Sequence, residues 1–131
     1  MARIYPKSER TLDCYKQIGA EMRLCKEITI KALCDLGKVL KARDIHKAFR
    51  ILNLLDEACD KADSQMYSDH RYEINSDYQD VFYGCLENPS RNAVDDEVRK
   101  RAALFAKEII KDIRNEEPEN DRSAGNCERP E

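Results

Sequence analysis

A regular spacing of apolar residues over residues 45–62 is the strongest pattern in the chain. The segment reads I-H-K-A-F-R-I-L-N-L-L-D-E-A-C-D-K-A, and its apolar positions are three and four residues apart. Such spacing places the apolar side chains on one face of an α-helix. The members of this face are Ile45, Ala48, Leu52, Leu55, Cys59 and Ala62. Because Phe49 and Ile51 widen the face on both sides, several neighbours are needed to cover it, and the pattern predicts the central helix of a helical bundle.

A second helical pattern precedes this segment and begins near Ser8 or Thr11, which are both favourable N-cap residues. Its apolar positions alternate steps of three and four, as in a heptad repeat: Tyr15, Ile18, Met22, Cys25, Thr29, Ala32, Leu36 and Val39. The helix ends either at Gly37 or near Arg43. Asp44 is then a suitable N-cap for the next helix, and so short a connection predicts an antiparallel hairpin.

Two further helices follow the hairpin. Ser76 and Gln79 match a capping box at the start of a short helix that we expect over residues 76–87. The last helix begins after Ser90 or Asn92, with acidic residues in its first turn and basic residues towards its end. This order of charges suits the helix dipole at both termini.

These patterns and the composition predict a single all-α domain. The chain has 131 residues, 37% of them charged, with four Gly, four Pro and no Trp, which suits a mostly helical protein. We expect an antiparallel bundle of about four helices over residues 1–115, followed by a disordered acidic tail over residues 116–131. No apolar run is long enough to cross a bilayer, and the N-terminus does not resemble a signal peptide. We therefore expect a cytoplasmic protein with no membrane contact.

The residue types that carry catalysis or bind metals show no suitable spacing. The six cysteines include no C-x-x-C pair, and in the absence of a secretion signal we expect reduced thiols. Cys25, Cys59 and Cys85 fall on predicted core faces. The two histidines, His46 and His70, have no helical i, i+4 partner that could share a metal, and no nucleotide-binding or hydrolase motif occurs. The sequence thus predicts a protein that is not an enzyme and needs no cofactor or metal.

Charge is distributed unevenly along the chain. The formal net charge is −3, but residues 1–50 carry +6, residues 51–90 carry −7 and residues 91–131 carry −2. The simplest interpretation is that neighbouring helices complement one another. The densest basic cluster, which we call the basic patch, surrounds the turn of the hairpin: Lys38, Lys41, Arg43, Lys47 and Arg50. It could meet phosphates, but the chain is acidic overall and has no aromatic residues interleaved there, so nucleic-acid binding remains an alternative.

The region 63–84 combines three features of a binding surface. Its helical periodicity is weak, its net charge is negative, and it contains four of the six tyrosines. Loops on a rigid scaffold often bind partners, and Tyr supplies contact area at a low entropy cost. The residues predicted to bind a protein partner are Tyr67, Asp69, Tyr72, Glu73 and Tyr83.

The expected function is that of a small protein-binding or regulatory module. Its partner is another protein, and self-association is a further option. The acidic middle of the chain also allows a different class, an inhibitor whose surface mimics phosphates and occupies the basic groove of a nucleic-acid-processing enzyme. Sequence alone does not decide between these classes.

Overall fold

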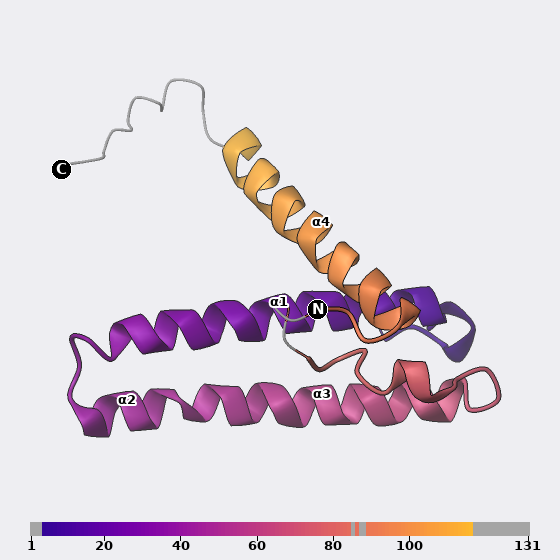
Figure 1. The fold of residues 1–131 in the computed structure, drawn as a ribbon, viewed down its shortest axis with the longest axis horizontal. Helices are drawn as coiled ribbons and strands as arrows, with labels where there is room; N and C mark the ends of the chain where they lie inside the picture. The colour runs from indigo at the N-terminus through magenta and orange to yellow at the C-terminus, as the bar shows by residue number, and fades with distance from the viewer. Residues whose placement is uncertain (1–3, 85, 87–88, 117–131) are drawn as a thin grey trace.

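The computed structural model describes residues 4–84, 86 and 89–116 of the chain (Figure 1). Regular secondary structure within these residues is entirely helical, and no strand occurs among them. The elements in chain order are the 3₁₀ turn η1 (Lys7–Glu9), the α-helices α1 (Leu12–Leu36), α2 (Ala42–Ala48) and α3 (Arg50–Asp69), the 3₁₀ turn η2 (Ser76–Tyr78) and the helix α4 (Ala93–Glu116). The all-α class is confirmed. The tail expected over residues 116–131 lies outside the described residues, apart from its first residue.

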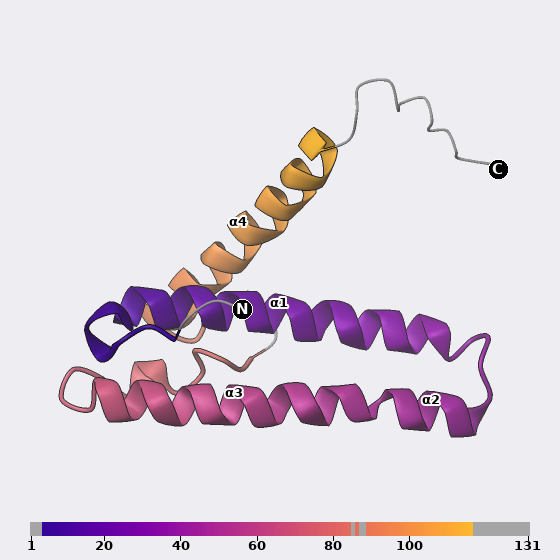
Figure 2. The same ribbon diagram turned by 180° about the vertical axis from the view of Figure 1, so that it is seen from behind.

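Helices α1 and α3 lie side by side and, with α2 at their far end, form a long antiparallel hairpin (Figures 1 and 2). Thr11 caps α1, since its Oγ1 accepts a hydrogen bond from the Cys14 amide at 3.1 Å. The helix ends just before Gly37, the earlier of the two ends that the sequence allows. The N-cap of α2 is Lys41 rather than Asp44, and it makes no side-chain cap.

The helix expected over residues 45–62 is divided between α2 and α3. The break falls at Phe49, and α3 then continues as far as Asp69. The central helix of the fold is α1, which packs against both α3 and α4. The prediction of a central helix over residues 45–62 is therefore wrong. Its wide apolar face is covered only in part, and Ile51 at its margin remains 48% exposed.

The segment between α3 and α4 does not form the helix expected over residues 76–87. Only the turn η2 forms there, and Asn75 caps it by accepting a hydrogen bond from the Asp77 amide at 2.9 Å. Val81 and Phe82, which the pattern places on a helical face, are instead buried in turn structure. Their burial is the same in either conformation, so the apolar pattern could not distinguish the two.

Gly19 on α1 makes room for this segment. A Cβ atom at Gly19 would lie 2.7 Å from Cγ1 of Val81 and closer still to the Val81 carbonyl oxygen. Arg23, one turn further along α1, donates a hydrogen bond from Nε to the same carbonyl oxygen at 3.3 Å. Gly84 then has a φ of 111°, a conformation that few other residues adopt, and it turns the chain away. The segment is therefore held by close backbone contact with α1.

The core lies at one end of the hairpin, where α1, α3, α4 and residues 80–83 meet. Its buried members are Tyr15, Ala20, Cys59, Met66, Val81, Phe82, Val98 and Ala102. Helix α4 starts at this end and is capped by Asn92, whose Oδ1 accepts a hydrogen bond from the Asp95 amide at 2.8 Å. It crosses α1 obliquely, and its C-terminal half diverges from the hairpin (Figures 1 and 2). The antiparallel bundle of about four helices is thus not confirmed.

Candidate functional site

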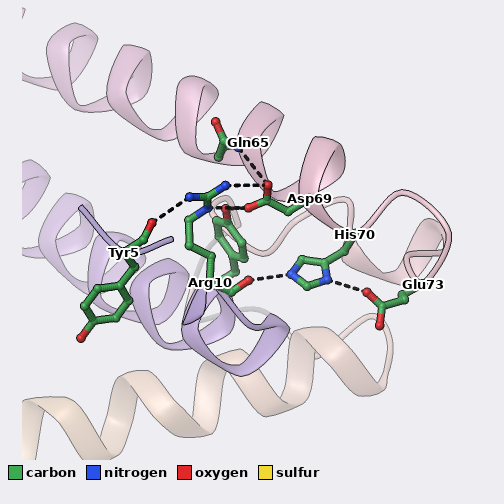
Figure 3. Close-up of polar contacts among 7 residues, drawn as sticks. Tyr5, Arg10, Gln65, Asp69, His70 and Glu73 are labelled. Atoms are coloured by element: carbon green, nitrogen blue, oxygen red, sulfur yellow. Dashed lines mark hydrogen bonds and ion pairs between the residues drawn. The ribbon is translucent and has the colours of Figure 1, made fainter. Parts of the chain in front are cut away.

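Asp69, at the end of α3, is the centre of a polar cluster that joins α3 to the start of α1 (Figure 3). Arg10 donates to both of its carboxylate oxygens, from Nε at 2.7 Å and from Nη2 at 2.9 Å. The Tyr15 hydroxyl donates to Oδ2 at 2.6 Å, and Gln65 donates to Oδ1 at 3.0 Å. The Asp69 side chain is only 3% exposed. The hydrogen bonds from Arg10 hold the pKa of Asp69 well below its usual range, so the carboxylate stays ionised.

His70 extends this cluster to the chain that precedes α1 (Figure 3). Its Nε2 lies 2.7 Å from the carbonyl oxygen of Arg10, and its Nδ1 lies 2.5 Å from Oε1 of Glu73. Only the protonated ring donates to both acceptors, and accordingly the bond to the Arg10 carbonyl, with a smaller contribution from Glu73, raises the pKa of His70. We call the whole group the Asp69 clasp: Arg10, Tyr15, Gln65, Asp69, His70 and Glu73.

The Asp69 clasp has the properties of a structural connection rather than of a catalytic site. Burial, followed by the hydrogen bond to Asp69, raises the pKa of Tyr15 to about 12, so its hydroxyl remains a protonated donor. The Asp69 carboxylate is surrounded by three donor side chains. A general base must be free to reach a substrate proton, and both ring nitrogens of His70 are already engaged. The clasp therefore holds the N-terminal segment against α3.

The residues predicted to bind a partner do not form one exposed patch. Asp69 is the buried centre of the clasp, and Glu73 is held by His70. Tyr67 is half-buried and packs against the core. Tyr72, by contrast, is 93% exposed. Most of this predicted surface is thus used to stabilise the fold.

Tyr83, the remaining member of that predicted surface, connects three parts of the structure. Its hydroxyl donates a hydrogen bond to Asp60 on α3. Lys26 of α1 lies over its ring, 4.9 Å from the centroid, and donates to the carbonyl oxygen of Phe82 at 3.1 Å. Burial, together with the bond to Asp60, raises the pKa of Tyr83 above its ordinary value. Tyr83 therefore fixes residues 80–83 against α1 and α3.

The basic patch lies at the far end of the hairpin, away from the core. Lys38 and Lys41 belong to the turn, Arg43 and Lys47 to α2, and Arg50 begins α3. All of these residues are exposed. Apolar side chains beside them are exposed as well: Leu36, Val39, Leu40, Ile51 and Leu54. The structure thus brings the predicted basic residues together and leaves them accessible.

A second accessible surface lies between α1 and α4, where the two helices diverge from their crossing (Figure 1). A pocket there is lined by apolar residues and by polar and charged residues: Leu24, Leu86, Ser90, Asp96, Arg99, Lys100, Ala102, Ala103 and Ala106. We use the name α1–α4 groove for this pocket together with three exposed isoleucines further along the two helices, Ile28 of α1 and Ile109 and Ile113 of α4.

Exposure rises along both walls of the α1–α4 groove with distance from the crossing. On α4 the exposed fraction is 1% at Ala102, 38% at Ile109 and 56% at Ile113. On α1 it is 0% at Ala20 and 57% at Ile28. On α4, Ala102, Ile109 and Ile113 are seven and four residues apart and share one face of the helix, and on α1 Leu24 lies four residues from both Ala20 and Ile28. The groove is therefore a continuation of the core faces of α1 and α4, left uncovered by the described part of the chain.

The heptad pattern of α1 predicts a seam that is buried along its whole length, and this seam does not include Leu24 or Ile28 of the α1–α4 groove. In the structure, Ile18 and Leu36 on that seam are each 41% exposed, and Cys25 is exposed too. The core position expected for Cys25 is wrong, Cys59 is buried as expected, and Cys85 lies outside the described residues. Periodicity identifies an apolar face, but it does not say whether the chain itself covers that face.

A metal centre is not formed by the described residues: within residues 4–84, 86 and 89–116, no three His, Cys, Asp or Glu side chains are placed to hold an ion. The cysteines resolved in this part of the chain, Cys14, Cys25, Cys34 and Cys59, are free thiols. None of the described helices combines the length and apolar character that crossing a membrane requires.

No protein-family model, curated protein or solved structure matches this chain. The function has to be argued from its own surfaces. The α1–α4 groove and the basic patch are accessible to a partner. The side chains of the Asp69 clasp, by contrast, are bonded to one another and stabilise the fold.

Proposed function

We propose that this chain is a small, non-enzymatic helical module that binds another protein in the cytoplasm. The observation that supports this proposal is the α1–α4 groove, in which the buried core face of α4 continues as an exposed apolar stripe. Large contiguous apolar surfaces on a folded protein mark interaction sites, because exposing them to water is unfavourable.

The kind of partner follows from the shape of the surface. Two diverging helices present a groove with apolar residues repeated at three and four positions, and this is the form in which proteins bind an amphipathic helix. Leu24 and Ala106 line the pocket, and Ile28, Ile109 and Ile113 are exposed further along the two helices. The predicted tyrosine surface is less suited to this role, since only Tyr72 extends freely from it.

The test is affinity capture of partners from native lysate, with and without nuclease. The disruptive variant is Ile109→Glu with Ile113→Glu, because both residues belong to the groove, and their side chains are exposed, at 38% and 56%, so their replacement should not unfold the protein. The matched control is Lys107→Ala with Lys111→Ala on the same turns of α4. Circular dichroism establishes that every variant is folded.

We expect the wild type and the control to retain a protein partner after nuclease treatment and the isoleucine variant to lose it. Equal retention by the isoleucine variant would contradict the proposal. Loss of all captured protein upon nuclease treatment would do so as well, because binding would then depend on nucleic acid.

A second candidate function is supported by the basic patch. Its five exposed cations at one end of the hairpin could contact phosphates, with an affinity that falls steeply as salt is added. The test is fluorescence anisotropy with labelled duplex and single-stranded oligonucleotides, comparing the wild type with Lys41→Glu and Arg43→Glu combined. The phosphate-mimicking inhibitor has less support, since Asp69 and Asp95 are buried in ion pairs.

A further inference from the structure

We infer that the end of the hairpin opposite the core binds the surface of a bilayer that contains anionic phospholipids. The inference goes beyond the proposed function, because it concerns the basic patch and not the α1–α4 groove. We call the contact surface the hairpin tip. It consists of the basic patch together with five exposed aliphatic residues beside it, Leu36, Val39, Leu40, Ile51 and Leu54.

Two of these aliphatic residues lie in the turn at the very end of the hairpin (Figure 1). The turn reads K-V-L-K from Lys38 to Lys41. Val39 is 77% exposed and Leu40 is 39% exposed, although each has a lysine beside it in the chain. Apolar side chains flanked by cations bind the interfacial layer of a bilayer, because apolar area is buried there while anionic lipids attract the cations.

The turn has a defined backbone without any partner. The amides of residues 38–40 donate to the carbonyl oxygens of Asp35 and Leu36 at 3.0 to 3.1 Å. Ile45 of α2 packs beneath the turn, since a Cβ atom at Gly37 would lie 3.5 Å from its Cγ1. These amides therefore need no new acceptor in a medium that is poor in water, and binding does not have to order the turn.

The cations of α2 and α3 share a face with an exposed leucine. Phe49, between the two helices, keeps helical dihedral angles, with φ −66° and ψ −12°, and the helices follow one line in both views (Figures 1 and 2). Arg43, Lys47, Arg50 and Leu54 are four, three and four residues apart, so they lie along one side of this line. Positive and apolar side chains are thus combined on the helices as they are in the turn.

The hairpin tip is positive although the chain as a whole is negative. Residues 35–54 contain the five cations of the basic patch against two carboxylates, Asp35 and Asp44, which gives +3 with His46 neutral, whereas the whole chain has a net charge of −3. Lys38 pairs with Asp35 at 3.1 Å, but both side chains are about three-quarters exposed, so this contact is weak. An anionic surface attracts this end and repels the remainder, which directs the tip towards the membrane.

The exposed aliphatic residues favour a bilayer over a nucleic acid as the partner. Phosphate contacts with a nucleic acid use cations and hydrogen-bond donors, and they leave Val39 and Leu40 without an apolar environment. A bilayer offers lipid phosphates and hydrocarbon within one surface. The sequence-based expectation of no membrane contact considered only segments that cross the bilayer, and a peripheral surface needs none.

Co-sedimentation of the full chain with vesicles tests the role of charge. The vesicles contain phosphatidylcholine and phosphatidylserine at about 3:1, or phosphatidylcholine alone, in about 0.1 M salt. We expect the wild type to bind only the anionic vesicles, and Lys41→Glu with Arg43→Glu to bind them at least about tenfold more weakly. Lys107→Glu with Lys111→Glu is the matched control, because it changes the net charge equally but lies on α4. This control should lose less than about threefold.

The same assay tests the aliphatic side chains separately from the charge. We expect Val39→Ser with Leu40→Ser to weaken binding at least about tenfold, because two side chains would no longer enter the apolar layer. Leu104→Ser with Ile110→Ser is the control, since these exposed residues of α4 lie outside the hairpin tip. Circular dichroism establishes that all variants are folded.

A fluorescent reporter then locates the contact. The chain contains no Trp, so Val39→Trp introduces a single reporter into the turn. We expect its emission to shift to the blue on the anionic vesicles and to be quenched by brominated lipids. Tyr72→Trp, placed in the loop at the other end of the hairpin, should show neither effect.

Several outcomes would overturn the inference. These are absence of vesicle binding, equal binding to both kinds of vesicle, and an unchanged emission of Val39→Trp on anionic vesicles. Release of the chain from the vesicles by an equimolar amount of duplex DNA would overturn it as well, because the basic patch would then prefer nucleic acid. None of these results concerns the α1–α4 groove, so the proposed protein-binding function fails or stands by its own test.

Discussion

Arg23 of α1 and Asp95 of α4 form an ion pair inside the protein, with Nη1 of the arginine 2.8 Å from Oδ1 of the aspartate. Their side chains are 0% and 4% exposed. Arg23 also donates to the carbonyl oxygens of Asp80 and Val81, so this one pair connects α1, α4 and residues 80–83. Burial acts to raise the pKa of Asp95, but hydrogen bonds from the Arg91 amide and from Arg23 outweigh it, and the pKa is lowered. The crossing of α1 and α4, which opens the α1–α4 groove, depends on this contact.

Removing one partner of this pair should destabilise the protein strongly. We expect Arg23→Ala to reduce the free energy of unfolding by about 3–5 kcal/mol, because a buried carboxylate would be left without its counterion. Urea denaturation measures the loss. The control is Lys100→Ala, which breaks the exposed pair with Asp96 and should cost less than about 1 kcal/mol. Similar losses in the two variants would show that the buried pair is not a structural anchor.

The position of the core gives a second prediction. We expect Phe82→Ala to cost about 3–5 kcal/mol, because this side chain is 0% exposed and its removal leaves a cavity. Leu55→Ala should cost less, because the Leu55 side chain is only half-buried and its removal leaves a smaller cavity. Chemical denaturation of both variants compares them directly. A larger loss of unfolding free energy in Leu55→Ala than in Phe82→Ala would mean that the helix over residues 45–62 is the centre of the fold.

The sequence predicts features that depend on residues close to one another in the chain, such as helix caps and helical periodicity. Thr11 and Asn92, each one of two caps that the sequence allows, are the caps in the structure, because a cap needs only a side-chain acceptor within reach of amides two or three residues on. Helical periodicity likewise identifies α1 and α4. The pattern fails over residues 76–87, where Val81 and Phe82 are buried without a helix. That outcome depends on Gly19, which is distant in sequence and leaves space for a turn.

The contacts of the Asp69 clasp cannot be predicted from a local sequence pattern. Arg10 and Asp69 are 59 residues apart, and their pairing is set by where the ends of α1 and α3 meet. The sequence places Asp69 on a binding surface because it is charged and close to tyrosines, but its neighbours in space make it structural. The α1–α4 groove cannot be recognised in the sequence either, because its apolar residues lack a covering neighbour in the described part of the chain. An apolar stripe looks the same in sequence whether its own chain or a partner covers it.

Cysteine reactivity provides a third prediction. Cys59 should react with iodoacetamide at least about tenfold more slowly than Cys25 and Cys34, because Cys59 is 1% exposed and its burial raises the pKa of its thiol. Peptide mass spectrometry after timed labelling gives the three rates. In denaturant the rates should converge. Rapid labelling of Cys59 in the native protein would mean that the core opens readily or is differently packed.

The Asp69 clasp gives a final prediction, concerning pH. A group whose pKa is raised by folding stabilises the folded state below its unfolded pKa, and this stabilisation is lost as the pH rises through the folded pKa. His70 is such a group, with an ordinary pKa of 6.5. Asp69 has a lowered pKa and loses its contribution only in acid, while Tyr15 titrates at about pH 12. Of these three groups, only His70 therefore changes charge near neutrality.

We expect the free energy of unfolding of the wild type, measured in urea at a series of pH values, to fall as the pH rises above the ordinary value of 6.5 and through the raised pKa of His70. In His70→Gln this particular fall should be absent, because glutamine does not titrate. Tyr72→Ala is the control, since Tyr72 is 93% exposed two residues away and its removal should leave the pH dependence intact. If His70→Gln shows the same fall as the wild type, His70 is not held in its protonated form by Arg10 and Glu73. The connection between the N-terminal segment and α3 would then depend on Arg10 and Asp69 alone.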